Sequence, residues 1–210
     1  MYEKFSLKVN QLAAIRGERL LYKQLDLSLT NGSLLQIKGE NGAGKTTLLR
    51  ALCLLNEPDA GELSLNNCPA NEDTSSYQQH ILYIGHQLGI KQRLTVTENL
   101  AFYRQLRSHQ LDTSIDEAID EVGLSGYEQV FSAMLSQGQK RRISMARLLL
   151  EAAPIWVLDE PFVALDVDGQ AWLSDKIAQH IQRGGACVFT SHQAVQLSSD
   201  LQVLELGKGK

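Results

Sequence analysis

The feature that most constrains the fold is the stretch GENGAGKT at residues 39–46. It fits G-x-x-x-x-G-K-[ST], a pattern in which the backbone N–H groups of a glycine-rich loop surround a phosphate group. The apolar run 34–37 precedes it and its last residue begins a helix-forming segment, TTLLRALCLL at 46–55, so the loop lies between a strand and a helix as the motif requires. We expect it to bind ATP, through Gly39, Glu40, Asn41, Gly42, Ala43, Gly44, Lys45, Thr46 and Thr47.

Within this phosphate loop (residues 39–46), Lys45 places a cation on the β- and γ-phosphates and the Thr46 hydroxyl is a ligand for Mg²⁺. A second apolar run, Ile155–Leu158, ends in two carboxylates, Asp159 and Glu160. Asp159 can complete the Mg²⁺ shell, and Glu160 can accept a proton from an attacking water. The sequence therefore predicts a catalytic carboxylate beside a metal-binding one.

Two further polar residues are candidates for contact with the γ-phosphate. His192 follows a third apolar run, 187–189, and Gln87 follows the segment YIGH. Three buried runs that each end in polar residues are typical of a parallel sheet, whose ligands bind beyond the carboxyl ends of the strands. We expect His192 and Gln87 to be catalytic, and Gln87 to be able to reach Mg²⁺ as well.

The rest of the chain indicates one α/β domain covering residues 1–210. Alternating Leu25, Leu27 and Leu29 predict a half-buried N-terminal strand. Residues 88–150 show a helical pattern and form an inserted helical subdomain, whereas 66–79 is polar and predicted to be a loop. The net charge of −4 and pI of 5.7 argue against a nucleic-acid partner.

The stretch LSQGQ at residues 135–139, here called the signature turn, raises a separate question. Ser136 and Gln139 form a capping box at the start of a helix, which accounts for both side chains. Gly138 in the first helical turn is not required by the cap, and glycine there costs about 1 kcal/mol relative to alanine. Glycine at a helix N-terminus lets another group, such as an anion, come close. The basic residues that follow, 140–142, are predicted to form a solvated helix face.

The order of these motifs resembles the nucleotide-binding domain of ABC ATPases over essentially the whole chain. The resemblance implies a RecA-like P-loop NTPase core with a parallel sheet, an N-terminal antiparallel β region and the inserted helical subdomain. It implies a homodimer in which Ser136, Gln137, Gly138 and Gln139 contact the γ-phosphate held by the other copy. Asp166, in the A-L-D turn at 164–166, would lie in a loop at the dimer interface. Arg16 stands where the family commonly stacks adenine on an aromatic ring, and a guanidinium plane can also stack on a base.

Two longer stretches, IGHQLGIKQRLTVTENLAFY at 84–103 and LDEPFVALDVDG at 158–169, resemble the ATP-binding subunits of the cytochrome c maturation transporters, the haem exporter group. This resemblance implies a peripheral subunit on the cytoplasmic face of a bacterial inner membrane. It also implies a CcmB-like integral membrane partner, with CcmC, CcmD and CcmE-type proteins in the same system. ATP hydrolysis would then support haem export or release of the haem-loaded chaperone CcmE.

Other functions are compatible with parts of the sequence. The ATPase subunit of another ABC transporter would carry the same motifs. A small-molecule P-loop kinase has a similar length, but it needs an acceptor pocket rather than a signature turn. A soluble ABC module acting on nucleic acid or ribosomes is less consistent with the acidic charge balance.

Overall fold

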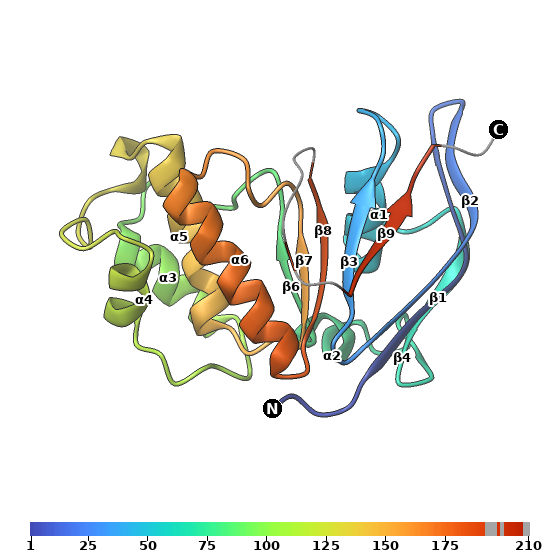
Figure 1. Cartoon of the computed structure of the whole chain (residues 1–210), viewed down its shortest axis with the longest axis horizontal. Coiled ribbons are helices and arrows are strands. Elements are labelled where there is room, and N and C mark those ends of the chain that lie inside the picture. Colours follow the sequence, from blue (N-terminus) through green and yellow to red (C-terminus); the bar gives the residue numbers. More distant parts are fainter. Residues whose placement is uncertain (192–196, 198–199, 208–210) are drawn as a thin grey trace.

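The computed structural model describes residues 1–191, 197 and 200–207. Its centre is a five-stranded sheet in the order β6-β7-β8-β3-β9, with every neighbouring pair parallel (Figure 1). The strands are β3 (Leu34–Lys38), β6 (Ile81–Ile84), β7 (Ile155–Leu158), β8 (Ala186–Thr190) and β9 (Leu201–Glu205). The parallel core predicted from the sequence is confirmed for β3, β7 and β8, whereas β6 and β9 were not predicted.

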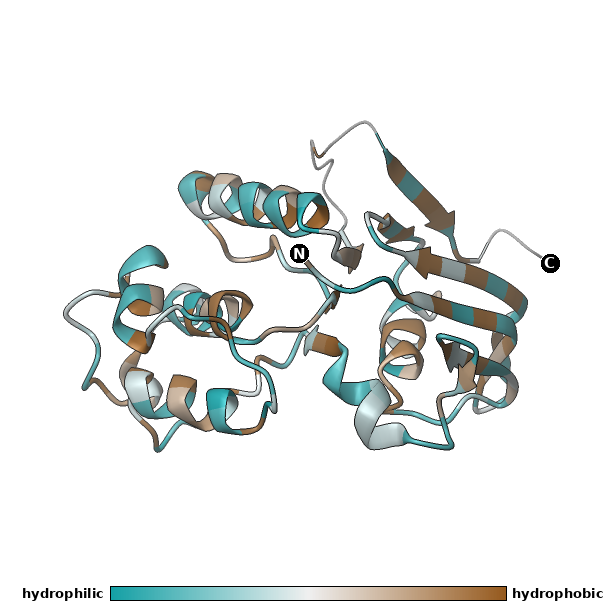
Figure 2. Ribbon diagram, turned by 90° about the horizontal axis from the view of Figure 1, so that it is seen from below, coloured by the Kyte–Doolittle hydropathy of each residue, from teal (hydrophilic) through white to brown (hydrophobic). Residues whose placement is uncertain are grey.

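A second, antiparallel sheet in the order β2-β1-β4-β5 lies beside the first, on the right in Figure 1. It consists of β1 (Ser6–Arg16), β2 (Arg19–Thr30), β4 (Ala60–Leu65) and β5 (Cys68–Pro69). Buried and exposed residues alternate along much of β1, and Figure 2 shows the same alternation of hydropathy along strands of this sheet. The predicted N-terminal antiparallel region is therefore confirmed.

Helix α1 (Lys45–Leu52) packs between the two sheets. Its apolar side chains share one buried cluster with residues of β1, β2 and β4 and with Ile155 and Val157 of the parallel sheet. The first turn of α1 follows the phosphate loop directly, so the packing of α1 fixes where that loop lies. The core therefore holds the loop against the carboxyl end of the sheet.

The opposite face of the parallel sheet is covered by α5 (Gln137–Leu150) and α6 (Val167–Gln182). Trp156 and Leu158 point to this side, because successive residues of a strand face opposite sides of a sheet. Both faces of β7 are thus buried, which explains why its sequence is an uninterrupted apolar run.

Between β6 and β7 the chain forms a mostly helical group, on the left in Figure 1. It contains α3 (Val96–Gln105), α4 (Ile115–Glu121) and the short helix η1 (Ser132–Met134), and it packs on one side of α5 around its own buried cluster. The capping box predicted at the start of α5 is present, and a second one, formed by Thr95 and Glu98, begins α3. Within the described residues, none of the helices has the length and apolar content needed to cross a membrane.

Two sequence predictions were wrong. Residues 66–79 are not only loop, because α2 (Thr74–Gln79) forms there and Asp73 caps it by accepting from the Ser76 N–H at 3.0 Å. The basic residues 140–142 are not a solvated face either. Arg141 is 5% exposed, and Arg142 is partly buried and paired with Asp166.

Candidate active site

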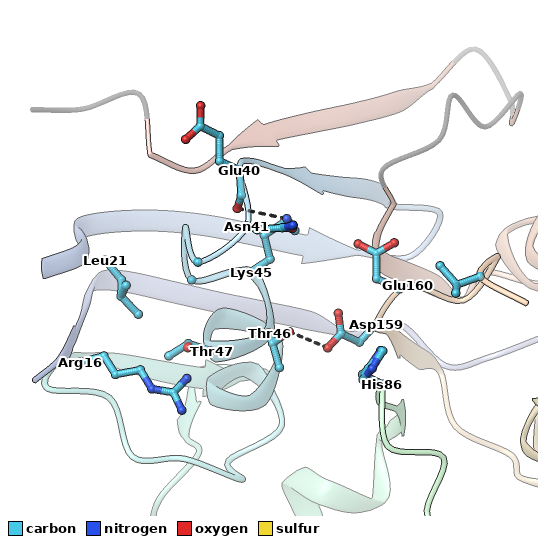
Figure 3. Close-up of a pocket in the computed structure, with 13 residues that line it drawn as sticks. Arg16, Leu21, Glu40, Asn41, Lys45, Thr46, Thr47, His86, Asp159 and Glu160 are labelled. Carbon is cyan, nitrogen blue, oxygen red and sulfur yellow. Dashed lines mark hydrogen bonds between the residues drawn. The ribbon is translucent and has the colours of Figure 1, made fainter. Parts of the chain in front are cut away.

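A pocket of about 490 Å³ lies at the carboxyl ends of β3 and β7, next to the first turn of α1 (Figure 3). Residues from the phosphate loop, from the end of β7 and from the β1–β2 hairpin line it together. They are Arg16, Leu21, Glu40, Asn41, Gly42, Gly44, Lys45, Thr46, Thr47, His86, Asp159, Glu160 and Val163. Most of the residues predicted to bind ATP, and both strand-end carboxylates, therefore share one cavity.

The phosphate loop has the backbone geometry that an anion site needs. Gly44 is the N-cap of α1 with φ of 98°, a left-handed conformation that side chains disfavour, and no side chain caps the helix there. Gly44 itself offers no side-chain acceptor to the first N–H groups of α1, and such groups at a helix N-terminus favour an anion. The Lys45 ammonium donates to the carbonyl oxygens of Gly39, at 2.8 Å, and Glu40, at 3.3 Å, so its charge lies beside the loop.

Asp159 is fixed by two hydroxyl groups, one from each side. Its Oδ2 accepts from Thr46 Oγ1 at 2.7 Å, and its Oδ1 accepts from Thr190 Oγ1 at 2.8 Å. The Asp159 side chain is 2% exposed and its backbone N–H donates to Ile84 O at 2.8 Å. The contact between Thr46 and Asp159, drawn in Figure 3, joins two motifs that are 113 residues apart in the sequence.

The Thr46 hydroxyl and the Asp159 carboxylate fit a Mg²⁺ ion. Both are hard oxygen ligands, and Mg²⁺ in nucleotide sites takes one or two protein oxygens while phosphates and water complete the shell. The described residues contain no cluster of three or more His, Cys, Asp or Glu side chains that could hold a metal ion. A two-oxygen site beside a phosphate loop therefore suits an ion that arrives with its nucleotide.

Glu160 follows Asp159 in an unusual backbone conformation. Its φ of 49° lies in the left-handed region, which a residue with a Cβ rarely adopts. The Glu160 N–H donates to Thr190 Oγ1 at 2.8 Å, so one hydroxyl of β8 holds both residues of the pair. The sharp turn directs the Glu160 side chain toward the pocket, beside Asp159 (Figure 3). Backbone strain of this kind is typical of functional positions.

Other expected residues differ in where the structure places them. Arg16 lines the pocket at the end away from Glu160, as expected for a residue near the base (Figure 3). Gln87 is exposed, and its neighbour His86 lines the cavity instead. His192 lies outside the described residues. His86 was missed although it precedes Gln87, because a lone histidine in a loop carries no periodic signal.

Leu21 and Val163 also line the pocket and were not foreseen. Both are apolar residues with ordinary sequence surroundings, so no pattern separates them from core residues. Leu21 also approaches Gly44, because a Cβ added there would lie 3.1 Å from the Leu21 Cβ. A side chain at Gly44 would therefore push against the hairpin that carries Arg16.

The signature turn does not line this pocket. Ser136 Oγ accepts from the Gln139 N–H at 3.1 Å, and the Ser136 N–H donates to Gln139 Oε1 at 2.9 Å. Among the described residues, a Cβ on Gly138 would meet the Ala164 carbonyl at 3.4 Å and Ser136 Oγ at 3.9 Å, both ordinary van der Waals distances. The packing of the chain itself therefore does not require glycine at 138.

Asp166 connects the A-L-D turn to the signature helix. Its two carboxylate oxygens each accept from Arg142 Nη2 at 2.8 Å, and Oδ1 also accepts from the Gly169 N–H at 3.0 Å. The hydrogen bond from Gly169 and the charge of Arg142 lower the pKa of Asp166. Asp166 is therefore a charged cap of α6 that also holds α5.

A phosphate loop, a strand-end carboxylate pair and a separate signature turn on this two-sheet α/β fold define an ATP-binding cassette ATPase. Comparison with known proteins agrees, since the ABC transporter family matches residues 22–163. The curated protein "Cytochrome c biogenesis ATP-binding export protein CcmA" of Escherichia coli O157:H7 is 46% identical over 193 residues, 91% of each chain. The protein of the same name from Dechloromonas aromatica is 44% identical over 96% of this chain and all of its own.

Solved structures show the same fold at lower sequence identity. An ABC transporter ATP-binding protein from Pyrococcus furiosus superposes with a TM-score of 0.78 at 24% identity, covering 96% of this chain and 97% of its own. An ATP-binding cassette solved as a dimer in a post-hydrolysis state, with ADP and Pi, superposes with a TM-score of 0.78 at 22% identity. The match covers 89% of this chain and 88% of that one. This chain belongs to the ABC transporter family and, within it, to the CcmA group of ATP-binding proteins.

Proposed function

We propose that this chain hydrolyses ATP in the pocket described above and so drives a transport step in cytochrome c biogenesis. The observation that carries the proposal is the meeting of Thr46, Asp159 and Glu160 at the phosphate loop, with 2.7 Å between the Thr46 and Asp159 oxygens. An acceptor pocket for phosphoryl transfer is not needed for this reaction. Membership of the ABC transporter family also argues against the kinase alternative.

Each residue has a distinct role in this proposal. Lys45 and the N–H groups of the loop bind the β- and γ-phosphates, and Thr46 and Asp159 hold Mg²⁺. The bound ion would neutralise charge that develops on the phosphate oxygens. The Glu160 carboxylate accepts the proton of a water whose oxygen attacks the γ-phosphorus, as the bond to the β-phosphate oxygen breaks.

Three more residues complete the proposed site. Arg16 stacks on the base, since it lies at the end of the pocket away from Glu160. Gln87 and His192 contact the γ-phosphate, and Gln87 can reach Mg²⁺ when the loop that carries His86 and Gln87 moves further into the pocket. Such closure movements commonly complete a catalytic site.

A head-to-tail homodimer supplies the signature turn. Gly138 is free of any packing need in its own chain, which supports a close approach by a group from outside. Met134 and Val167, which flank the signature turn and the A-L-D turn, are 78% and 82% exposed. Apolar side chains of this exposure favour burial against a partner. Ser136, Gln137, Gly138 and Gln139 of one copy would then contact the γ-phosphate bound by the other, with Asp166 at the interface.

A groove on another part of the surface is suited to binding a membrane partner. A groove of about 290 Å³ is lined by residues that follow α1 and by residues of α2, β6, α3 and α5, and two of its lining residues, Leu55 and Leu106, are 47% and 57% exposed. We propose that this groove receives a CcmB-like integral membrane subunit. The chain would then work at the cytoplasmic face of a bacterial inner membrane, with CcmC, CcmD and CcmE-type proteins in the same system. The shared name of the curated relatives supports the assignment to cytochrome c biogenesis.

The variant Glu160→Gln tests the catalytic part of the proposal. It keeps the shape of the side chain but cannot accept a proton, so we expect ATP binding within threefold of wild type, turnover reduced at least a hundredfold, and accumulation of an ATP-bound dimer. Titration with a fluorescent ATP analogue measures binding, phosphate release measures turnover, and light scattering measures the amount of dimer. Glu62→Gln, at an exposed position of β4, is the matched control. Full turnover by Glu160→Gln would remove Glu160 from the mechanism.

The partner is tested by purification from membranes. Wild-type chain should co-purify with an integral membrane subunit, and Leu106→Asp should weaken that association without changing ATP binding. Recovery of the chain with nucleic acid and no membrane subunit would favour a non-transport module instead.

A further inference from the structure

A buried arginine joins the signature helix to the catalytic turn. Arg141 lies two residues beyond the signature turn in α5, and it is 5% exposed. Its Nη2 donates to the Asp159 carbonyl at 3.3 Å and to the Glu160 carbonyl at a shorter distance. A guanidinium so deeply buried is expensive unless it has charged or polar partners. Within the described part of the chain its partners are backbone oxygens of the two residues that carry the proposed chemistry.

Those two carbonyls belong to a turn that needs outside support. Glu160 has a left-handed φ of 49°, a conformation that a residue with a Cβ holds only when its surroundings impose it. Thr190 fixes the N–H side of Glu160, at 2.8 Å. Arg141 fixes the carbonyl side, and the same Glu160 carbonyl accepts from the Val163 N–H at 3.2 Å. The peptide groups on both sides of the Glu160 side chain are therefore anchored, one by β8 and one by α5.

We infer that Arg141 is a positioning residue, which sets the orientation of Glu160 and ties it to the signature helix of the same chain. The inference rests on the proposed role of Glu160 and on the proposed contact of the signature turn with ATP in the partner. Under that arrangement, α5 touches the ATP of one site while Arg141 at its first turns holds the catalytic carboxylate of the other site. A movement of α5 on contact with ATP is then passed to Glu160 through two hydrogen bonds.

If Arg141 had only a structural role, its substitution would have different effects. If Arg141 only filled space, an apolar side chain of similar length would serve as well, and stability would change without a selective effect on the 160–163 turn. If it positions Glu160, loss of its N–H donors must loosen that turn and slow hydrolysis while ATP still binds. Among the described residues, the hydrogen bonds of Arg141 go to Asp159 and Glu160 and not to the phosphate loop, which is proposed to bind ATP.

The test compares Arg141→Met, Arg141→Lys and the control Lys140→Met in the full-length chain. Lys140 is the neighbour of Arg141 on α5, and it makes one weak contact, to the Ala133 carbonyl at 3.5 Å. Hydrogen–deuterium exchange of the nucleotide-free chain measures the amides of Glu160, Phe162 and Val163, since Pro161 has no N–H. Titration with a fluorescent ATP analogue gives Kd, and phosphate release gives kcat and KM.

We expect the amides of Glu160, Phe162 and Val163 to exchange at least tenfold faster in Arg141→Met than in Lys140→Met. We also expect kcat to fall at least tenfold with Kd within threefold of wild type, and Arg141→Lys, which keeps one charged donor, to recover most of both losses. Equal exchange in the Met variant and its control would overturn the inference, and so would a loss of ATP binding as large as the loss of kcat. If Arg141→Met does not fold, Arg141→Leu, which also lacks N–H donors, gives the same comparison. A wild-type chain that hydrolyses no ATP would refute the proposed function, but the exchange result would still decide the role of Arg141.

Discussion

Replacing Thr190 by valine should destabilise the chain more than its small change in shape suggests. Thr190 is fully buried at the end of β8, and its hydroxyl donates to Asp159 Oδ1 and accepts from the Glu160 N–H, both at 2.8 Å. Valine has nearly the same volume but no hydroxyl. Thr190→Val therefore removes both hydrogen bonds and leaves a carboxylate oxygen and an N–H group without them.

The expected magnitude follows from the burial of these two groups. A buried polar group that loses its partner costs roughly 1–3 kcal/mol. Asp159 is 2% exposed and should show most of that cost, whereas Glu160 is only partly buried and its N–H can regain contact with water. We therefore expect a loss of roughly 2–4 kcal/mol in the free energy of unfolding. With a urea m-value of about 2–3 kcal/mol/M, the midpoint should fall by about 1–2 M.

Urea unfolding followed by circular dichroism measures this shift, and Thr190→Ser is the control. Serine keeps the hydroxyl and loses one methyl group, which costs about 1 kcal/mol. Thr190→Val should thus be clearly less stable than Thr190→Ser. The reasoning is refuted if the valine variant matches or exceeds the serine variant in stability, because the two hydrogen bonds would then contribute nothing net.

Two further predictions concern other parts of the molecule. His180 stacks on Trp156 and contacts the Pro154 carbonyl, and burial lowers its pKa to about 4. Because its pKa in the unfolded chain is near 6.5, the folded state loses stability as the pH falls from 6.5 toward 4, by up to roughly 3 kcal/mol in the free energy of unfolding. His180→Phe should flatten this dependence of the urea midpoint between pH 4.5 and 7, and an unchanged slope would show that other groups cause it. Lys45→Met should weaken ATP binding at least tenfold in a fluorescence titration, because the Lys45 ammonium lies within the phosphate loop, 2.8 Å from the Gly39 carbonyl oxygen. The same variant should have a urea midpoint within about 0.5 M of the wild-type midpoint. Unchanged affinity would show that Lys45 does not contact the nucleotide.

The parts of the fold predicted from the sequence are those with a strong local signal. Residues 34–37 and Ile155–Leu158 are uninterrupted apolar runs, and each strand is followed by polar residues with a recognisable role. The capping box of α5 depends only on residues three apart, so spacing alone identifies it. In each of these cases the physical cause of the structure lies within a few residues of the feature it explains.

The elements that were missed lack such a signal. Strand β6 has only four residues, and β9 has a partly exposed, mixed sequence, since it lies at the edge of the sheet. Helix α2 has six residues and is mostly polar, and it depends on its cap and on buried Tyr77 rather than on an apolar stripe. For short elements, tertiary packing decides the outcome, and periodicity has too few residues to report it.

Arg141 shows the same limit at the level of a single side chain. Its type and its place in the KRR sequence at 140–142 favour exposure, because charged side chains are seldom buried without partners. Its partners are the backbone carbonyls of Asp159 and Glu160, 18 and 19 residues away. Because every residue has a backbone carbonyl, the sequence does not indicate which ones will accept a hydrogen bond from Arg141. The Thr46–Asp159 contact could be expected, although it spans 113 residues, because a metal site requires two particular oxygen ligands. Long-range contacts are thus predictable from sequence where a ligand dictates the chemistry of both partners, and they have to be observed where one partner is only the main chain.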